Sequence, residues 1–146
     1  MGYEGLMVIG IVVSILYYEL GSVSPGGLIV PGYFAAAVGQ PGRMIVTLLV
    51  ASVGALCTRA LARVFILYGR RRLAVAILST LAIYGLFLRT GLFAGLSNGL
   101  GGGIEMIGWI VPGILAYELD KQGPVLTVSA LASASACTWM VAWILA

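Results

Sequence analysis

Histidine and charged residues are what this chain lacks or has least of. Its 146 residues include eight Lys and Arg, five Asp and Glu and no His, so only 9% are charged. A water-soluble domain carries charge on about a quarter of its residues, and this chain has no polar face to cover a soluble core. The missing histidine argues against a metal centre. The two cysteines, Cys57 and Cys137, lie in apolar runs where nothing suggests a disulfide.

The motifs of a self-sufficient enzyme are absent as well. No Gly-Lys-Ser or Gly-Lys-Thr follows the glycine-rich stretches, so the sequence has no phosphate-binding loop. No nucleophile lies near a general base, which argues against ligation or hydrolysis by the chain alone. We therefore expect no catalytic residue, metal or cofactor in this chain. The net charge of +3 comes mostly from one basic stretch and reports membrane topology, with no nucleic-acid partner expected.

Long apolar runs dominate what is present, and hydrophobic residues make up 61% of the chain. In hydrocarbon every peptide group needs an internal partner, so such runs should be helices or protein-lined breaks between helices. The sequence therefore predicts an all-α, multi-pass integral membrane protein with a single membrane domain, residues 1–146, and a retained first helix. The charge-free runs are Gly5–Tyr18, Leu20–Gly42, Met44–Thr58, Leu73–Leu88 and Gln122–Ala146.

Two halves of the chain resemble each other. Ile29-Val30-Pro31-Gly32 recurs as Ile110-Val111-Pro112-Gly113, an offset of 81 residues (110 − 29). Cys57-Thr58 recurs as Cys137-Thr138, an offset of 80 (137 − 57), and Gln40-Pro41-Gly42 is echoed by Gln122-Gly123-Pro124, an offset of 82 (122 − 40). Three matches in one order predict two pseudo-repeats of about 80 residues. The first covers residues 3–68 and the second residues 73–146, each within a few positions.

Each half is expected to contain an apolar helix, a glycine-rich loop, a Pro-Gly segment, a turn and a longer apolar helix. Three crossings in each half would give six spans and inverted copies, which we favour; re-entrant Pro-Gly segments would instead give four spans and parallel copies. The predicted elements are Leu6–Leu20, Gly21–Leu28, Ile29–Gly39, Gln40–Gly42 and Arg43–Tyr68 in the first half, and Leu73–Leu88, Arg89–Gly103, Ile104–Leu119, Asp120–Pro124 and Val125–Leu145 in the second.

The paired Pro-Gly motifs are the first candidate site. Pro31 and Pro112 remove backbone donors, and Gly32 and Gly113 permit positive φ. Each motif can therefore leave peptide groups unpaired at membrane depth, and matching breaks in two repeats point to a transport or binding site. The alternative is that each proline merely kinks a packed helix.

The basic cluster Arg70–Arg72 is the second candidate. The positive-inside rule places it in the cytoplasm, and Arg59 and Arg63 precede it on one helical face. The cluster can bind anionic lipid, an anionic polymer or an acidic partner, or act only as a topological anchor, the alternative that we favour. Among the possible acid/base groups, those at helix ends are interpreted as anchors rather than as a proton or cation path. The acids considered are Glu19, Glu105, Glu118 and Asp120.

Taken together, these stretches resemble the membrane subunit of bacterial poly-γ-glutamate synthase, the PgsC/CapC family. The resemblance runs from about Glu19 to Trp139 in the family order. The chain departs from the family at Gly95–Gly103, a glycine-rich insert that we interpret as a loop. The matching stretches are Pro25–Tyr33, Gln40-Pro41, Ile66–Arg72, Gly108–Gly113 and Lys121–Gly123.

The resemblance implies a subunit of a bacterial cytoplasmic-membrane complex that makes and exports poly-γ-glutamate as capsule or free polymer. It implies two partners: a cytosolic Mur-like ligase that holds ATP and Mg²⁺, and an anchored extracytoplasmic export subunit. The rival interpretations are a small self-contained secondary transporter or channel, and an assembly anchor without polymer contact. The candidates for the path of the anionic polymer are Pro31, Gly32, Pro112 and Gly113, and those for ligase docking or polymer contact are Arg63, Arg70, Arg71 and Arg72.

Overall fold

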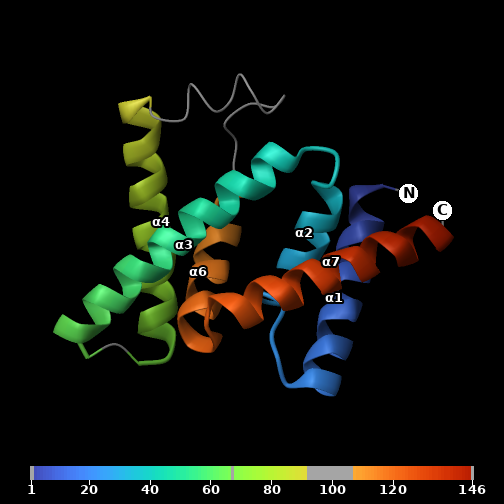
Figure 1. Ribbon diagram of the computed structural model, residues 1–146, viewed down its shortest axis with the longest axis horizontal. Helices are drawn as coiled ribbons and strands as arrows, with labels where there is room; N and C mark the ends of the chain where they lie inside the picture. The colour runs from blue at the N-terminus through green and yellow to red at the C-terminus, as the bar shows by residue number, and fades with distance from the viewer. Residues whose placement is uncertain (1, 67, 92–106, 146) are drawn as a thin grey trace.

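The computed structural model describes residues 2–66, 68–91 and 107–145, and all the regular structure in these ranges is helical (Figure 1). The helices are α1 (Tyr3–Gly21), α2 (Val30–Ala36), α3 (Pro41–Val64), α4 (Arg70–Thr90), α6 (Val111–Gln122) and α7 (Pro124–Leu145). Of these, α1, α3, α4 and α7 are long and apolar enough to cross a membrane. The all-α prediction is confirmed for the described residues, and the four long helices are compatible with a multi-pass membrane protein.

The two Val-Pro-Gly motifs begin the short helices α2 and α6. Pro31 and Pro112 lie in the first turns, where a helix has no partner for the missing N–H and where the fixed φ of proline suits the helix. The preceding residues have nearly the same backbone angles, φ −98° and ψ −26° at Ile29 against φ −96° and ψ −28° at Ile110. The same three residues thus start a helix in the same way at both places.

Two polar stretches are helical where the sequence suggested loops. Arg70–Arg72 forms the first turn of α4, directly after Gly69, whose φ is 58°. Asp120 was expected in a turn, but α6 continues through Gln122 and ends at Gly123, whose φ is 95°. Glycine adopts positive φ without strain, so these two glycines, rather than the charged residues beside them, decide where the helices begin and end.

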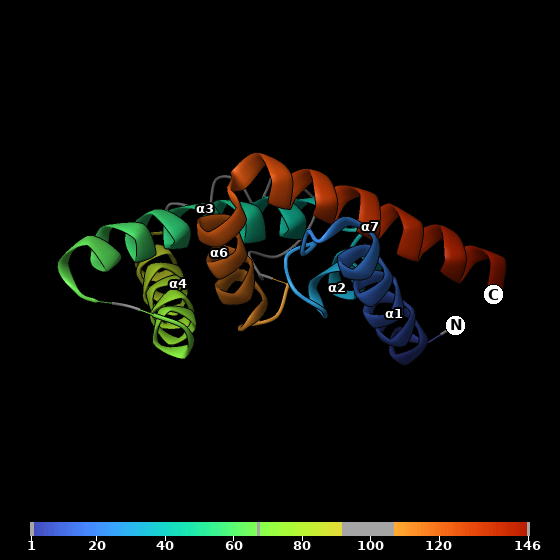
Figure 2. The ribbon, with the colours of Figure 1, turned by 90° about the horizontal axis from the view of Figure 1, so that it is seen from below.

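The helices form two layers. In one layer α4, α6, α2 and α1 stand in a row, and in the other the long helices α3 and α7 lie across them (Figures 1 and 2). The buried core lies around α2 and α6 and includes Val30, Phe34, Leu115 and Leu131, each 2% exposed or less. Since lipid tails are as apolar as these side chains, close packing rather than exclusion of water must hold such a core together in a membrane.

The two helices of the second layer, α3 and α7, each pack against the other half of the chain. The first-half helix α3 contacts α4 and α6, whereas the second-half helix α7 contacts α1 and α2. Within each half the opening helix contacts the short one, α1 with α2 and α4 with α6, and α6 also contacts α7 across their short connection. The helices α3 and α7 are therefore exchanged between the halves: α3 covers the short helix α6 of the second half, and α7 covers the short helix α2 of the first half.

Glycine lets each short helix approach its neighbour closely. A Cβ on Gly10 of α1 would lie 2.5 Å from Gly32 Cα, and a Cβ on Gly113 of α6 would lie 2.7 Å from the Cα of Ile77 on α4. In both cases the obstacle is backbone, which cannot rotate away as a side chain can. Small residues at helix contacts provide this close approach in membrane proteins. The glycines of both Pro-Gly motifs are therefore packing residues.

We expect Gly113→Ala to destabilise the protein by about 1–3 kcal/mol, as overpacking does, because the new methyl group would push α6 away from α4. Gly85→Ala on α4 is the matched control. A Cβ there meets nothing within 4 Å, and alanine favours a helix over glycine by about 1 kcal/mol. Thermal unfolding in detergent should show a lower melting temperature for Gly113→Ala only. Equal melting temperatures for Gly113→Ala and the wild type would contradict the close approach.

Candidate functional site

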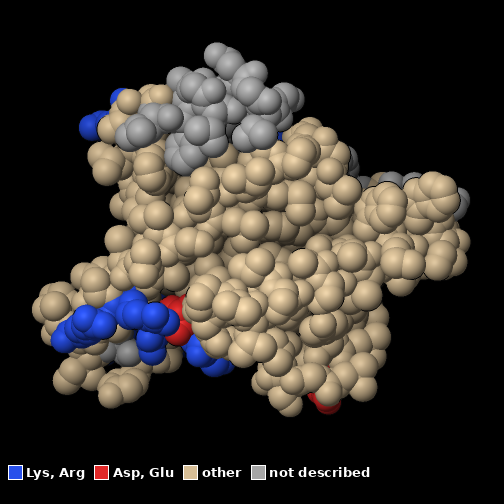
Figure 3. All heavy atoms as spheres, viewed as in Figure 1, with Lys and Arg blue, Asp and Glu red and all other residues tan. Residues whose placement is uncertain are grey.

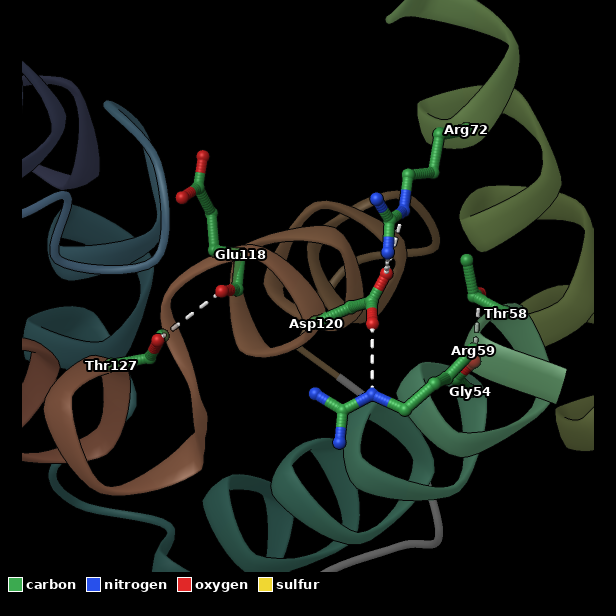
Figure 4. A network of polar contacts seen from close by, with 7 residues as sticks. All are labelled: Gly54, Thr58, Arg59, Arg72, Glu118, Asp120 and Thr127. Atoms are coloured by element: carbon green, nitrogen blue, oxygen red, sulfur yellow. Dashed lines mark hydrogen bonds and ion pairs between the residues drawn. The ribbon is translucent and has the colours of Figure 1, made fainter. Parts of the chain in front are cut away.

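A buried carboxylate joins three helices at one end of the bundle (Figure 4). The side chain of Asp120 on α6 is only 1% exposed. Its Oδ1 accepts a hydrogen bond from Nε of Arg59 on α3 at 3.2 Å, and its Oδ2 accepts one from Nε of Arg72 on α4 at 2.7 Å. Nη2 of Arg72 also contacts Oδ2. These bonds compensate the carboxylate for lost hydration, because a buried charge without partners is strongly destabilising.

Both arginines keep donors for other groups. The side chain of Arg59 is 51% exposed and that of Arg72 is 35% exposed. An arginine has five N–H donors, and Arg59 uses only Nε on Asp120, while its two terminal nitrogens point away from the carboxylate (Figure 4). Two guanidinium groups around one carboxylate leave this group of three positively charged.

Most of the positive charge of the chain gathers at the same end. The ion pairs of Asp120 bring together the end of α3, the start of α4 and the end of α6. Figure 3 shows the basic side chains as a blue band beside an acidic group at the lower left. The other two basic residues, Arg43 near the start of α3 and Arg89 near the end of α4, lie at the opposite end. Six residues form what we call the basic end: Arg59, Arg63, Arg70, Arg71, Arg72 and Lys121.

A second set of polar contacts ties the first half of the chain to the basic end. The side-chain oxygen of Gln122 accepts a hydrogen bond from the backbone N–H of Ser24 at 3.0 Å, and its Nε2 donates to the Ser24 carbonyl at 3.2 Å. The same Nε2 donates to Glu118 at 2.6 Å. Because Ser24 follows α1, these bonds place the segment after α1 beside the end of α6.

The structure places the residues of both Pro-Gly motifs inside the helix packing. Pro31, Gly32, Pro112 and Gly113 are all buried. Gly32 faces α1 and Gly113 faces α4. In the second motif, the N–H of Gly113 donates to the carbonyl of Ile110 at 3.0 Å, so this donor is already satisfied. Packing accounts for the motifs without a ligand, and a polymer path lined by them stays a prediction.

The three arginines of Arg70–Arg72 differ in their surroundings. Arg70 and Arg71 are exposed, as is Arg63 on α3, and these side chains are accessible to a partner. Arg72 instead turns toward Asp120 and links α4 to α6. Replacing all three arginines together would therefore mix the loss of a docking surface with the loss of a contact that holds the fold.

The pairing of Asp120 with Arg59 and Arg72 was not predicted from the sequence. The spacing of these residues does not indicate which helices face one another. A signal was nevertheless present, because an acid within an apolar segment usually pairs with a basic residue or lies in a functional site. Among the described residues, no group of His, Cys, Asp and Glu is placed to hold a metal ion. Glu105 and the insert Gly95–Gly103 lie outside the described residues.

We expect Asp120→Asn to lower the free energy of unfolding by about 1–3 kcal/mol. The loss should stay below that for a fully buried pair, because both arginines can turn toward water. Arg71→Gln, an exposed change in the same turn as Arg72, should leave the melting temperature unchanged. The Asp120→Asn/Arg72→Gln double variant should lose less than the sum of the two single losses, since each change removes the same contact. Additive losses would show that Asp120 and Arg72 are not coupled.

Comparison with known proteins identifies relatives of this chain. The model of the family described as "Capsule biosynthesis CapC" matches residues 9–128. The capsule biosynthesis protein CapC of Bacillus anthracis is 30% identical over 142 residues, which cover 92% of this chain and 89% of the relative. The PGA biosynthesis protein CapC of Bacillus subtilis (strain 168) is 29% identical over 141 residues, which cover 94% of this chain and 91% of the relative. No solved structure matches the chain. The family expected from the motifs is confirmed, and the chain belongs to the capsule biosynthesis CapC family.

Proposed function

We propose that this chain is the membrane subunit of a synthase that makes and exports poly-γ-glutamate as capsule or exopolymer. The observation that carries the proposal is its family membership, since relatives named for capsule and PGA biosynthesis match it over about nine-tenths of their length. The basic end supports the proposal. A polyanion made beside this surface would be concentrated there, because a surface of one charge attracts molecules of the other.

In this proposal the catalytic step belongs to a partner. Joining glutamate units through amide bonds requires activation of a carboxyl group, which a cytosolic Mur-like ligase holding ATP and Mg²⁺ would perform. An anchored extracytoplasmic subunit would assist export. This chain would contribute the membrane scaffold and the basic end. The positive-inside rule then places the basic end on the cytoplasmic face of the bacterial cytoplasmic membrane, where the ligase works.

Reconstitution tests this division of labour. Proteoliposomes that hold the chain alone should neither make nor transport poly-γ-glutamate, and polymer should form only when the ligase, ATP, Mg²⁺ and glutamate are added. Polymer yield and length, measured by gel filtration, are the readouts. Polymer transport by the chain alone would favour the rival interpretation, a self-contained transporter or channel. An equal yield of polymer without this chain would contradict the proposal.

The same system tests the docking surface. Arg70→Gln with Arg71→Gln removes exposed charge and leaves Arg72 on Asp120, so the fold should persist while the ligase co-purifies less. The wild-type association should weaken as salt is raised, because exposed charges are screened. Arg89→Gln, an exposed change at the opposite end of α4, is the control and should retain the ligase. Full ligase retention by the Arg70/Arg71 variant at low and high salt would place docking elsewhere.

We infer further that the two halves are inverted copies. Corresponding helices make corresponding contacts, and α1, α2 and α3 run in directions opposite to α4, α6 and α7 (Figure 1). The ion pair between Arg72 and Asp120 supports the same arrangement, because it brings the end of α6 to the start of α4. Lys121, the neighbour of Asp120, would then lie on the cytoplasmic side with Arg70 and Arg71.

Thiol labelling tests this topology. In a chain whose Cys57 and Cys137 are replaced by Ser, Lys121→Cys should react with an impermeant maleimide only after the cells are permeabilised. Arg89→Cys, at the other end of the bundle, is the matched control and should react on intact cells. Labelling of Lys121→Cys from outside would overturn the inverted arrangement. Labelling of neither variant on intact cells would contradict the outward position of Arg89.

A further inference from the structure

Arg59 borders a cavity between α3 and the adjoining ends of α6 and α7. The cavity has a volume of about 240 Å³ and is lined by residues of α3, the end of α6 and the start of α7. The lining residues of α3 are spaced three, four and seven positions apart, so they form one face of the helix. This face extends about 10 Å along the helix axis. The lining residues are Ser52, Ala55, Leu56, Arg59, Leu119 and Pro124.

The charged group of this cavity, Arg59, lies at one end. The hydroxyl of Ser52 donates to the carbonyl of Leu48 at 2.7 Å, so it needs no partner in the cavity. Leu56 is 65% exposed, so the cavity is open to the surface of the bundle. At the other end, the terminal nitrogens of Arg59 point away from Asp120 and have no hydrogen-bond acceptor within the described part of the chain (Figure 4). The site thus combines an apolar wall with one cationic group, the guanidinium of Arg59.

We propose that this cavity binds one anionic phospholipid, with its phosphate on Arg59 and an acyl chain along α3. A guanidinium group binds phosphate through paired hydrogen bonds, and the apolar wall suits methylene groups. Asp120 acts as the positioning residue, because its bond to Nε turns the terminal nitrogens of Arg59 outward. A polycarboxylate is charged along its whole length and suits the exposed Arg70 and Arg71 instead. This site does not depend on the proposed function.

Native mass spectrometry of the full-length chain in detergent tests the proposal. Phosphatidylglycerol and phosphatidylcholine with the same acyl chains are titrated separately. The wild type should bind one phosphatidylglycerol roughly tenfold more tightly than phosphatidylcholine, as expected for a charge-assisted hydrogen-bonded contact. Arg59→Gln should abolish this preference. Arg63→Gln removes the same charge one turn further along α3, beyond the cavity, and should retain the preference.

A cavity variant separates a built site from general surface charge. Ser52→Phe fills the apolar end and leaves the contacts of Arg59 intact, so it should weaken the binding of both lipids without lowering the melting temperature. Three results would each overturn the proposal. They are equal losses in Arg59→Gln and Arg63→Gln, full lipid binding by Ser52→Phe, and displacement of the lipid by equimolar inorganic phosphate or by poly-γ-glutamate oligomer.

Discussion

The carboxylate of Asp120 lies between two guanidinium groups that come from different helices, and the meeting of α3, α4 and α6 depends on it. Each arginine bonds a different oxygen, so neither helix can shift along α6 without breaking a hydrogen bond. The chain has only five acidic residues, so such contacts are few. Because charge-assisted hydrogen bonds have a preferred geometry, this contact fixes the orientation of the helices more closely than apolar packing does. The contact also aligns the basic side chains of three helices at one end.

Close backbone contacts at glycine complete the arrangement that the ion pairs orient. Gly32 and Gly113 allow the short helices to rest on α1 and α4, and the exchanged long helices then cover them from the other layer. The two short helices are thus held by packing on both sides, while the charged side chains of the described residues lie near the ends of the helices. Close packing thus holds the middle of the bundle and the ion pairs orient its end, which explains how a chain with few charged residues adopts one defined arrangement of helices.

Features with a local cause could be predicted from the sequence, and features that depend on tertiary contacts could not. Apolar run length predicted the long helices, and the start of α2 lies one residue from the start predicted at Ile29. The second segment was expected from Ile104, but α6 begins later, at its Val-Pro-Gly motif. The motifs together also indicated the correct family. Helix ends were less accurate, because Gly69 and Gly123 move the boundaries past the charged residues beside them. The partners of Asp120 depend on how three helices cross, and residue spacing contains no information on that crossing.

The exchange of long helices also sets the order in which the protein can be assembled during translation. α1 and α2 can pair as soon as both have emerged from the ribosome, but α3 finds its partners α4 and α6 only after the second half has been made. Until then α3 lacks the helices that it packs against. α7 follows every other described helix and closes over the first pair. Translation that stops before α7 would therefore leave α1 and α2 without the helix that covers them.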